Sequence, residues 1–354
     1  MKKKVLLFSV LAVVFLALGA GFVFSQRTCP WISEKQKTPQ SPSQVRKPKV
    51  LVIDSYHKGY PWSEGILEGI RNVFKASLLE DDTFDCSASP VLLRLERMDT
   101  KRNQSESFKV QAGLKVKEVI DSWKPDLVIA ADDNASAYVI APFYRNTDLP
   151  AVFCGVNWEA SAYGFPCRNV TGMIEVDLVE SMVQTMQKYA AGSRLVTLGA
   201  DNESNRKAVD NYIRQAGLTI AEKVFVENLE QFKKAYLDLQ SRADMLILTP
   251  PSFLTASEED QQEARRFVLE NTKIITGSVE SWIAPYTVFC FSKSPQEQGR
   301  WAAEAALKIL DGASPASLPV VCNQQAVLFL NMPLARKLNL VFPVQMLEQA
   351  VLIQ

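Results

Sequence analysis

The segment from Asp54 to Trp62 gathers side chains that can transfer protons, act as nucleophiles or stack on a planar group. They are Asp54, Ser55, Tyr56, His57, Tyr60 and Trp62. Because His57 is the only histidine of the chain, a histidine-activated nucleophile would have to use it, and the nearest hydroxyl is that of Ser55. Two residues on one loop are weak evidence for such a pair. The same side chains suit hydrogen bonding and stacking in a binding site.

Motifs that would support catalysis are absent from the sequence. It contains no G-x-G-x-x-G, G-x-x-x-x-G-K-[ST], H-E-x-x-H or G-x-S-x-G. Nucleotide-binding, zinc-protease and hydrolase functions therefore lose their main support. No Cys-x-x-Cys or Cys/His spacing indicates a metal site. We expect a chain that is not an enzyme and that carries no metal or cofactor.

A second polar cluster, Asp132-Asp133-Asn134, follows the apolar run 127–130. Neighbouring carboxylates can act as an acid/base pair. Consecutive side chains point apart, however, and Asp133 or Asn134 can instead cap a helix that begins near Ala135 while one acidic group faces a ligand. We favour this second interpretation.

Similar polar or turn-forming clusters follow other apolar runs, at 155–158, 201–204, 250–252 and 277–280. Singly, each is typical of a helix cap or a tight turn. Together they would line one crevice if their strands belong to two facing sheets, and helix N-termini there favour an anionic group on a ligand. Tyr56, Tyr60 and Trp62 can stack on a planar solute, or Tyr60 and Trp62 can pack around the turn at Pro61.

Strands and helices are expected to alternate along the chain, which predicts an α/β fold with two successive doubly wound units. Continuous apolar runs are typical of strands buried on both faces of a parallel sheet. The expected strands are 50–53, 91–95, 127–130, 151–154, 194–199, 220–226, 245–248, 273–276, 288–291 and part of 320–330. The expected helices are 66–74, 108–123, 135–144, 178–189, 204–216, 229–239, 257–270 and 296–310, and the stretch 155–172 is expected to be irregular.

The length of 354 residues exceeds the size at which one core keeps growing, so two lobes are expected. Lys and Arg together number 39, as do Asp and Glu. Without a basic excess, nothing points to a nucleic-acid partner.

The N-terminus has the features of an export signal. Basic residues precede the uncharged, mostly apolar stretch 5–24, which is long enough to cross ~30 Å of hydrocarbon. Residues 1–26 are therefore a cleaved signal peptide or a retained membrane anchor, and both remain open. The proline-containing segment 27–48 is expected to be a flexible tether.

Six cysteines at positions 29, 86, 154, 167, 290 and 322 permit disulfides in an oxidising compartment. The sequence forces no pairing. Cys154–Cys167 is one candidate bridge, whereas Cys154 and Cys290 could equally be buried thiols within strands.

Several segments in this order resemble the ABC transporter substrate-binding protein family. They are SYHKGYPWSEGILEGI at 55–70, ADDNA at 131–135, VFCGVN at 152–157, NVTG at 169–172 and VLFLNMPLARKLNLVFP at 327–343. The resemblance extends over about residues 49–354. It implies the type I periplasmic-binding-protein fold, in which two Rossmann-like lobes are joined by three crossings and close on a small solute.

The resemblance also implies partners and a site. A membrane permease and an ATPase would be the partners of a monomeric protein. The implied ligand contacts are Ser55, Tyr56, Asp133, Asn134, Asn157, Asp201 and Ser278, to which we add Tyr60 and Trp62 as candidate stacking residues. We expect lobe 1 to comprise 49–157 and 279–318, and lobe 2 to comprise 158–278 and 319–354.

The sequence thus predicts a solute-binding protein of an ABC importer in the periplasm or on the extracytoplasmic face of the membrane. Its solute would be an amino acid or a similar small organic anion. A ligand-sensing module that serves a separate membrane kinase or cyclase is the alternative.

Overall fold

The computed structural model describes residues 46–251 and 257–354. Lys47–Gln354 forms one compact unit. The signal or anchor expected at residues 1–26 lies outside the described residues, as does nearly all of the expected tether. Among the described residues, no helix is both long and apolar enough to cross a bilayer.

The first sheet has six strands in the order β13-β7-β6-β5-β1-β4, and all its pairings are parallel. Its strands are β1 (Lys49–Asp54), β4 (Leu92–Arg97), β5 (Leu127–Ala131), β6 (Ala151–Asn157), β7 (Val170–Glu175) and β13 (Val321–Cys322). Four of them, β1, β5, β6 and β7, are almost wholly buried, which the apolar runs predict for β1, β5 and β6.

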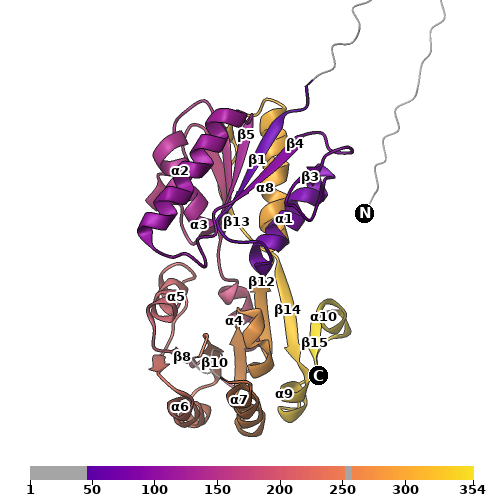
Figure 1. Cartoon of the computed structure of the whole chain (residues 1–354). Helices are drawn as coiled ribbons and strands as arrows, with labels where there is room; N and C mark the ends of the chain where they lie inside the picture. The colour runs from indigo at the N-terminus through magenta and orange to yellow at the C-terminus, as the bar shows by residue number, and fades with distance from the viewer. Residues whose placement is uncertain (1–45, 252–256) are drawn as a thin grey trace, which may run out of the picture. The chain divides into compact units, whose positions relative to one another are not determined.

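Helices cover both faces of the first sheet (Figure 1). On one face lie α1 (Pro61–Phe74) and α8 (Pro295–Leu310). On the other lie α2 (Glu106–Trp123), the short α3 (Asp132–Ala135) and the π-helical segment Ser136–Tyr144 that continues it. The backbones of α1 and α8 approach so closely that a Cβ on Gly299 would overlap the carbonyl oxygen of Ile66. Small antiparallel strands β2 (Ser77–Leu78) and β3 (Phe84–Asp85) form a separate hairpin.

The second sheet has seven strands in the order β15-β14-β12-β11-β10-β8-β9. They are β8 (Leu195–Ala200), β9 (Glu222–Val226), β10 (Met245–Leu248), β11 (Ile275–Ser278), β12 (Phe289–Lys293), β14 (Ala326–Asn331) and β15 (Val351–Ile353). Among the described pairings of this sheet, β12–β14 alone is antiparallel. The second doubly wound unit is therefore present, and the predicted α/β fold class is confirmed.

The remaining helices accompany the second sheet or the connections. They are α4 (Val179–Gln187), α5 (Glu203–Arg214), α6 (Leu229–Arg242), α7 (Glu258–Asn271), α9 (Met332–Lys337) and α10 (Val344–Gln349), with 3₁₀ turns at Ser161–Tyr163, Ser281–Tyr286 and Pro315–Ser317. One continuous core joins α4, α6, α7 and α9 to the second sheet.

Sheet membership differs from the lobe boundaries expected from the sequence. The segment 158–175, expected in lobe 2, contributes β7 to the first sheet, where it pairs with β6. Conversely, β12 was expected in lobe 1 but lies in the second sheet. β13 was expected in lobe 2 but lies in the first sheet. The chain therefore passes between the sheets after β7, after β12 and after β13. Strand pairing, rather than the turn residues near Asn157, decides where these three crossings fall.

Two side chains tie the crossings together. Asn323 Nδ2 donates to the carbonyl of Val176 at 3.1 Å. Asn323 Oδ1 accepts from the backbone N–H of Val176 at 2.7 Å. Glu297, at the start of α8, accepts from the backbone N–H groups of Gln324 and Gln325 at 3.0 and 2.8 Å. The crossing segments lie outside the sheets, so their backbone N–H and C=O groups have no strand partner, and these side-chain bonds supply one.

The candidate disulfide Cys154–Cys167 is not formed, and both residues carry free thiols. Cys154 is fully buried within β6, whereas the thiol of Cys167 contacts the side chain of Asn169 at 3.5 Å. Cys154 and Cys290 are instead buried thiols within strands, which was the alternative expectation.

Candidate functional site

Ser55 uses its hydroxyl to join β1 to the start of α3. Its Oγ donates to the carbonyl of Ala131 at 2.6 Å and accepts from the backbone N–H of Ala135 at 2.8 Å. The side chain is completely buried. Because the hydroxyl proton points to a carbonyl and not to His57, the two residues do not form a nucleophile–base pair. Ser55 instead fixes the backbone of the neighbouring loop.

Tyr56, Tyr60 and Lys101 form an aromatic group with a cation beside it. The two rings meet edge to face at 4.9 Å between centroids. The ammonium of Lys101 lies 5.4 Å from the ring centroid of Tyr56 and 5.5 Å from that of Tyr60. His57 packs against Tyr60, and its Nδ1 is 3.8 Å from a carboxylate oxygen of Asp99.

Asp132 follows β5 in an unusual conformation. Its φ is +70°, a region that non-glycine residues rarely occupy. Its Oδ1 accepts from the indole N–H of Trp62 at 2.8 Å, while its Oδ2 is buried without a hydrogen-bond partner. Burial raises the pKa of this carboxyl well above its ordinary value, and the charge of Glu175 raises it further. Trp62 is partly buried and packs against the core of the first sheet, while its indole N–H bonds to Asp132.

Asp133 and Asn157 are neighbours at the carboxyl ends of β5 and β6. Asp133 Oδ2 accepts from the Asn157 side-chain amide at 2.6 Å, and Oδ1 accepts from the hydroxyl of Tyr163 at 2.7 Å. Asn134 donates to the hydroxyl of Thr100 at 2.7 Å. The structure thus brings together Asp133 and Asn157, two of the polar residues suggested by the sequence, whereas the Asn134 side chain bonds to Thr100. None of the three side chains caps the short helix α3, which has no side-chain cap.

Lys293 connects the two sheets. It ends β12 in the second sheet, and its ammonium lies 2.8 Å from Glu175 at the end of β7 and 2.6 Å from Asp177. All three side chains are largely buried. Burial opposes the charge on Lys293, but the three carboxylates of Glu175, Asp177 and Glu280 outweigh it and raise the pKa of the ammonium. Burial raises the pKa of Glu175, and Lys293 partly offsets that rise.

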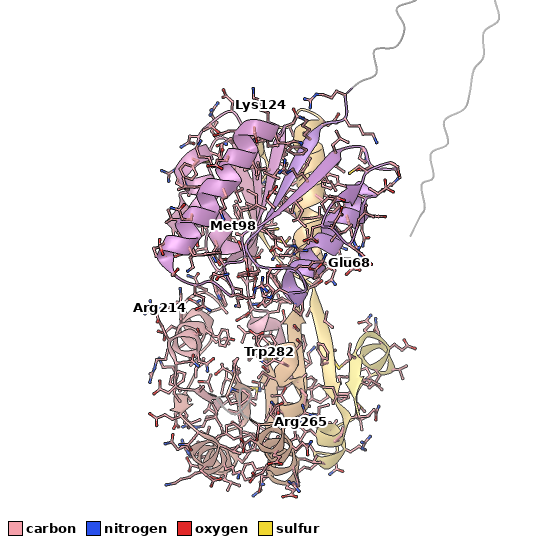
Figure 2. The ribbon with its side chains drawn as sticks, viewed as in Figure 1. Glu68, Met98, Lys124, Arg214, Arg265 and Trp282 are labelled. Atoms are coloured by element: carbon pink, nitrogen blue, oxygen red, sulfur yellow. The ribbon has the colours of Figure 1, made fainter. Side chains whose placement is uncertain are left out.

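Glu280 brings a further carboxyl from the second sheet, just after β11. Burial raises its pKa to about 7, with Lys293 lowering it and Asp177 and Glu175 raising it. Trp282, labelled in Figure 2, follows it on the same turn and is 56% exposed. Trp158, after β6, packs against Tyr212 of α5 with 6.3 Å between ring centroids.

We call Asp132, Asp133, Glu175, Asp177 and Glu280 the acidic cluster, because these carboxyls influence one another electrostatically. The cluster lies where strands of both sheets end. This contrasts with the anionic ligand that helix N-termini suggested at the sequence level, since carboxylates repel a second negative charge.

Among the described residues, the two contacts expected from the second-sheet half bond to no carboxyl of this cluster. Ser278 is fully buried within β11, where its Oγ accepts from the backbone N–H of Glu280. Asp201 is exposed, and its carboxylate forms an ion pair with the guanidinium of Arg206 on α5, with 2.6 Å between oxygen and nitrogen. Sequence reasoning missed Glu175, Asp177 and Lys293, and it treated Glu280 only as part of a turn. The sequence signal for Glu175, Asp177 and Glu280 was an acidic residue directly after an apolar one, whereas Lys293 follows Ser292 and gave no such signal.

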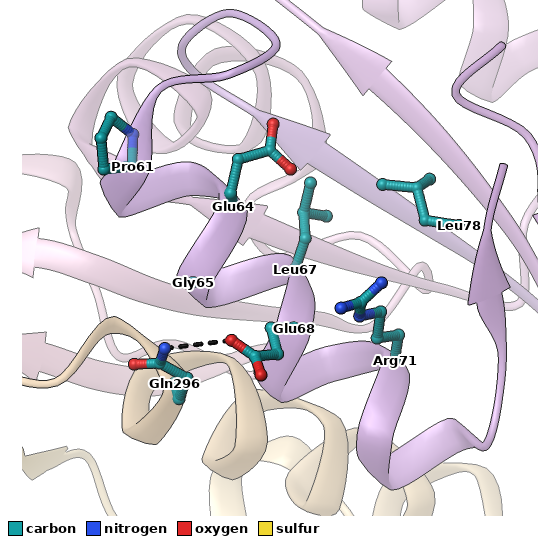
Figure 3. Close-up of a pocket in the computed structure, with 8 residues that line it drawn as sticks. All are labelled: Pro61, Glu64, Gly65, Leu67, Glu68, Arg71, Leu78 and Gln296. Carbon is teal, nitrogen blue, oxygen red and sulfur yellow. Dashed lines mark hydrogen bonds between the residues drawn. The ribbon is translucent and has the colours of Figure 1, made fainter. Parts of the chain in front are cut away.

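A pocket of about 280 Å³ lies along α1 and the first turn of α8 (Figure 3). Its carboxyl groups already have partners: Glu68 accepts from Gln296 at 3.1 Å, and Glu64 accepts from Arg97 at 3.1 Å. It belongs to the helical layer and contains none of the acidic cluster. In the part of the chain that the structure describes, no group of His, Cys, Asp and Glu side chains is arranged to hold a metal ion.

Similar folds occur in substrate-binding proteins. A ligand-free, open substrate-binding protein with adhesive properties from Clostridium difficile superposes with a TM-score of 0.65 at 16% identity, covering 87% of this chain and 99% of that one. An ABC domain from Streptococcus pneumonia in complex with L-Trp gives 0.53 at 15% identity, covering 87% and 100%. A conserved domain protein from Vibrio cholerae gives 0.54 at 15% identity, with the same coverage. These similarities concern the fold.

The comparison with curated protein sequences gives no match. A family profile, described as ABC transporter substrate binding protein, matches residues 96–353. That range includes most of both sheets and every residue of the acidic cluster. The chain therefore belongs to the ABC transporter substrate-binding protein family.

Proposed function

We propose that the chain is the extracytoplasmic solute-binding protein of an ABC importer, which binds an amino acid or a similar small organic anion between its two sheets. The observation that carries the proposal is the bridge from Lys293 to Glu175 and Asp177. It joins the carboxyl ends of strands in both sheets, the location at which open α/β folds bind ligands. Family membership supports the same role.

Binding in this proposal uses rings and polar groups at the strand ends. Tyr56, Tyr60 and Trp62 supply aromatic surface, and Asp133 and Asn157 supply hydrogen-bonding groups. Ser55 and Asn134 position the loop through their own bonds to neighbouring elements. Asp201 and Ser278 would contribute from the second sheet. The similar fold from Streptococcus is a complex with L-Trp, but at its low identity the solute class must rest on the residues of this chain.

Hinge motion at the three crossings would open and close the site, with Asn323 and Glu297 keeping the crossings in register. The partners would be a membrane permease and an ATPase, and the protein would act as a monomer, exported by its N-terminal segment. No turnover is expected from such a protein, because binding without chemistry is its role.

The test is to identify the solute. Protein purified without refolding would be denatured, and the released small molecules analysed by mass spectrometry. The refolded, empty protein would then be titrated with amino acids and small organic acids, with intrinsic tryptophan fluorescence and melting temperature as readouts. A saturable change with one compound class supports the proposal. If no member of the panel changes either signal, an import role for such solutes is refuted.

A further inference from the structure

Residues 55–60, which we call the aromatic loop, join β1 to α1 and carry two of the candidate stacking rings. The loop contains neither helix nor strand, so bonds to neighbouring groups must fix its backbone. Asp54, which ends β1 and is 1% exposed, accepts from the backbone N–H of Tyr56 at 3.0 Å. Glu64, in the first turn of α1, accepts from the backbone N–H of Gly59 at 2.8 Å. Two carboxylates therefore hold the loop, one near each end.

A single guanidinium contacts both of these carboxylates. Arg97, which ends β4, donates from Nη1 to Asp54 at 2.5 Å and from Nη2 to Glu64 at 3.1 Å. Its side chain is only 10% exposed. A guanidinium is planar and presents its N–H groups in a fixed fork. The positions of the two carboxylates, and with them the two ends of the aromatic loop, are therefore coupled through Arg97.

The hairpin of β2 and β3 holds the other side of this guanidinium. Asp82, between the two strands, accepts from Arg97 Nε at 3.2 Å and from Nη2 at 3.4 Å. Its carboxylate also lies 3.4 Å from the ammonium of Lys58, a residue of the aromatic loop. That ammonium donates in addition to the carbonyl of Glu80 in the hairpin. The hairpin thus contacts the loop directly through Lys58 and indirectly through Arg97.

The rings of the aromatic loop depend on its backbone for their position. Tyr56 and Tyr60 meet edge to face with 4.9 Å between centroids, so a shift of the loop displaces both rings. The helix α1 begins directly after Tyr60, and no side chain caps its N-terminus. A site binds tightly when its groups are held in place before the solute arrives, because less order then has to be gained on binding.

We propose that Arg97 is a positioning residue of the solute site, which holds the aromatic loop in its binding conformation through Asp54 and Glu64. Asp82 of the hairpin keeps the guanidinium in place. This inference rests on the proposed function and adds to it a control of affinity by residues that bond to the loop and not to the solute. Only molecules whose loop has the binding conformation take up solute, so a looser loop raises the apparent Kd in proportion.

Amide hydrogen exchange tests the loop without any solute. The N–H groups of Tyr56 and Gly59 bond to the two carboxylates, so their exchange rates, measured by NMR, report on these contacts directly. Arg97→Lys keeps the positive charge but loses the fork, and both amides should exchange about tenfold or more faster. Amides of β10, in the second sheet, should keep their wild-type rates. A general loss of stability would accelerate those amides as well.

Affinity tests the consequence for binding. Wild type and variants would be titrated with the panel of amino acids and small organic acids, to which any solute released on denaturation is added, and the tightest-binding compound compared. Asp82→Asn removes the charge beside Arg97 and Lys58 but tolerates the φ of +62° at this position. It should weaken binding by about three- to tenfold. Asp85→Asn is the matched control and should change neither affinity nor exchange, because Asp85 lies on β3 of the same hairpin and bonds to Ser87 at 2.9 Å.

The outcomes separate this inference from the proposed function. Faster exchange at both amides together with weaker binding supports the positioning role. If Arg97→Lys leaves both amides at their wild-type rates, other contacts hold the loop and the inference is wrong. If the amides exchange faster while Arg97→Lys and Asp82→Asn bind as tightly as the wild type, the loop does not control affinity, and the inference is wrong while solute binding stands. If no compound binds the wild type, the proposed function fails and this inference fails with it.

Discussion

Replacing Glu280 by glutamine should make the protein more stable at neutral pH. The pKa of Glu280 rises from its ordinary value of 4.5 to about 7, chiefly because the group is buried. At ~1.4 kcal/mol for each pH unit, keeping this group ionised in the folded protein costs about 3 kcal/mol. Glutamine has nearly the same shape and never carries the charge.

The sign follows from proton uptake. A carboxyl with a raised pKa holds its proton longer in the folded state than in the unfolded state, so its favourable contribution is complete below pH 4.5 and disappears as the pH rises through about 7. Glu280→Gln should therefore match the wild type near pH 4.5. Its advantage should grow to about 3 kcal/mol at pH 8.

The assay is urea unfolding at several pH values between 4.5 and 8, followed by tryptophan fluorescence. The matched control is Glu304→Gln, which removes an exposed carboxyl and should give a stability curve parallel to that of the wild type. If the curves of Glu280→Gln and wild type also remain parallel across this range, burial does not perturb Glu280 and the charge argument for the acidic cluster is refuted.

Three further substitutions test other contacts. Lys293→Met should lower the free energy of unfolding by about 3–5 kcal/mol, since two buried carboxylates lose their counter-charge; a loss below about 1 kcal/mol in urea unfolding would contradict this. Ser55→Ala should cost about 1–3 kcal/mol in the same assay, because the carbonyl of Ala131 and the N–H of Ala135 lose their partner. Gly299→Ala should cost about 1–3 kcal/mol by forcing α1 and α8 apart, and an unchanged melting temperature would show that the helices adjust freely.

Local patterns in the sequence predicted most elements of the fold. The runs that form β1, β5 and β6 are apolar without interruption, so they indicate buried parallel strands whatever their partners. The strand β7 was missed because Thr171, Gly172 and Glu175 interrupt its apolar character. Its burial comes from pairing with β6 and β13. That pairing also moved the first crossing beyond the position expected near Asn157.

The candidate site was predictable only in its first-sheet half. Asp133 and Asn157 follow neighbouring strands, and the structure places them in contact. The sequence could not show that Glu175 pairs with Lys293, because a contact between residues on different sheets leaves no local pattern. The conformation of Asp132 was equally hidden, since a positive φ at an aspartate is set by the surrounding structure and not by the residue type.

The ion pair of Lys293 with Asp177 lies at the crossings between the sheets. Asp177 follows β7 at the first crossing, and Lys293 ends β12 at the second. Glu175 at the end of β7 raises the pKa of Glu280 in the second sheet, because each negative charge opposes the ionisation of the other carboxyl. A ligand can shift a conformational equilibrium only through its different affinity for the two states. In this protein, a ligand that changes the balance of charge between the sheets would therefore act directly on the crossings about which the hinge motion is proposed.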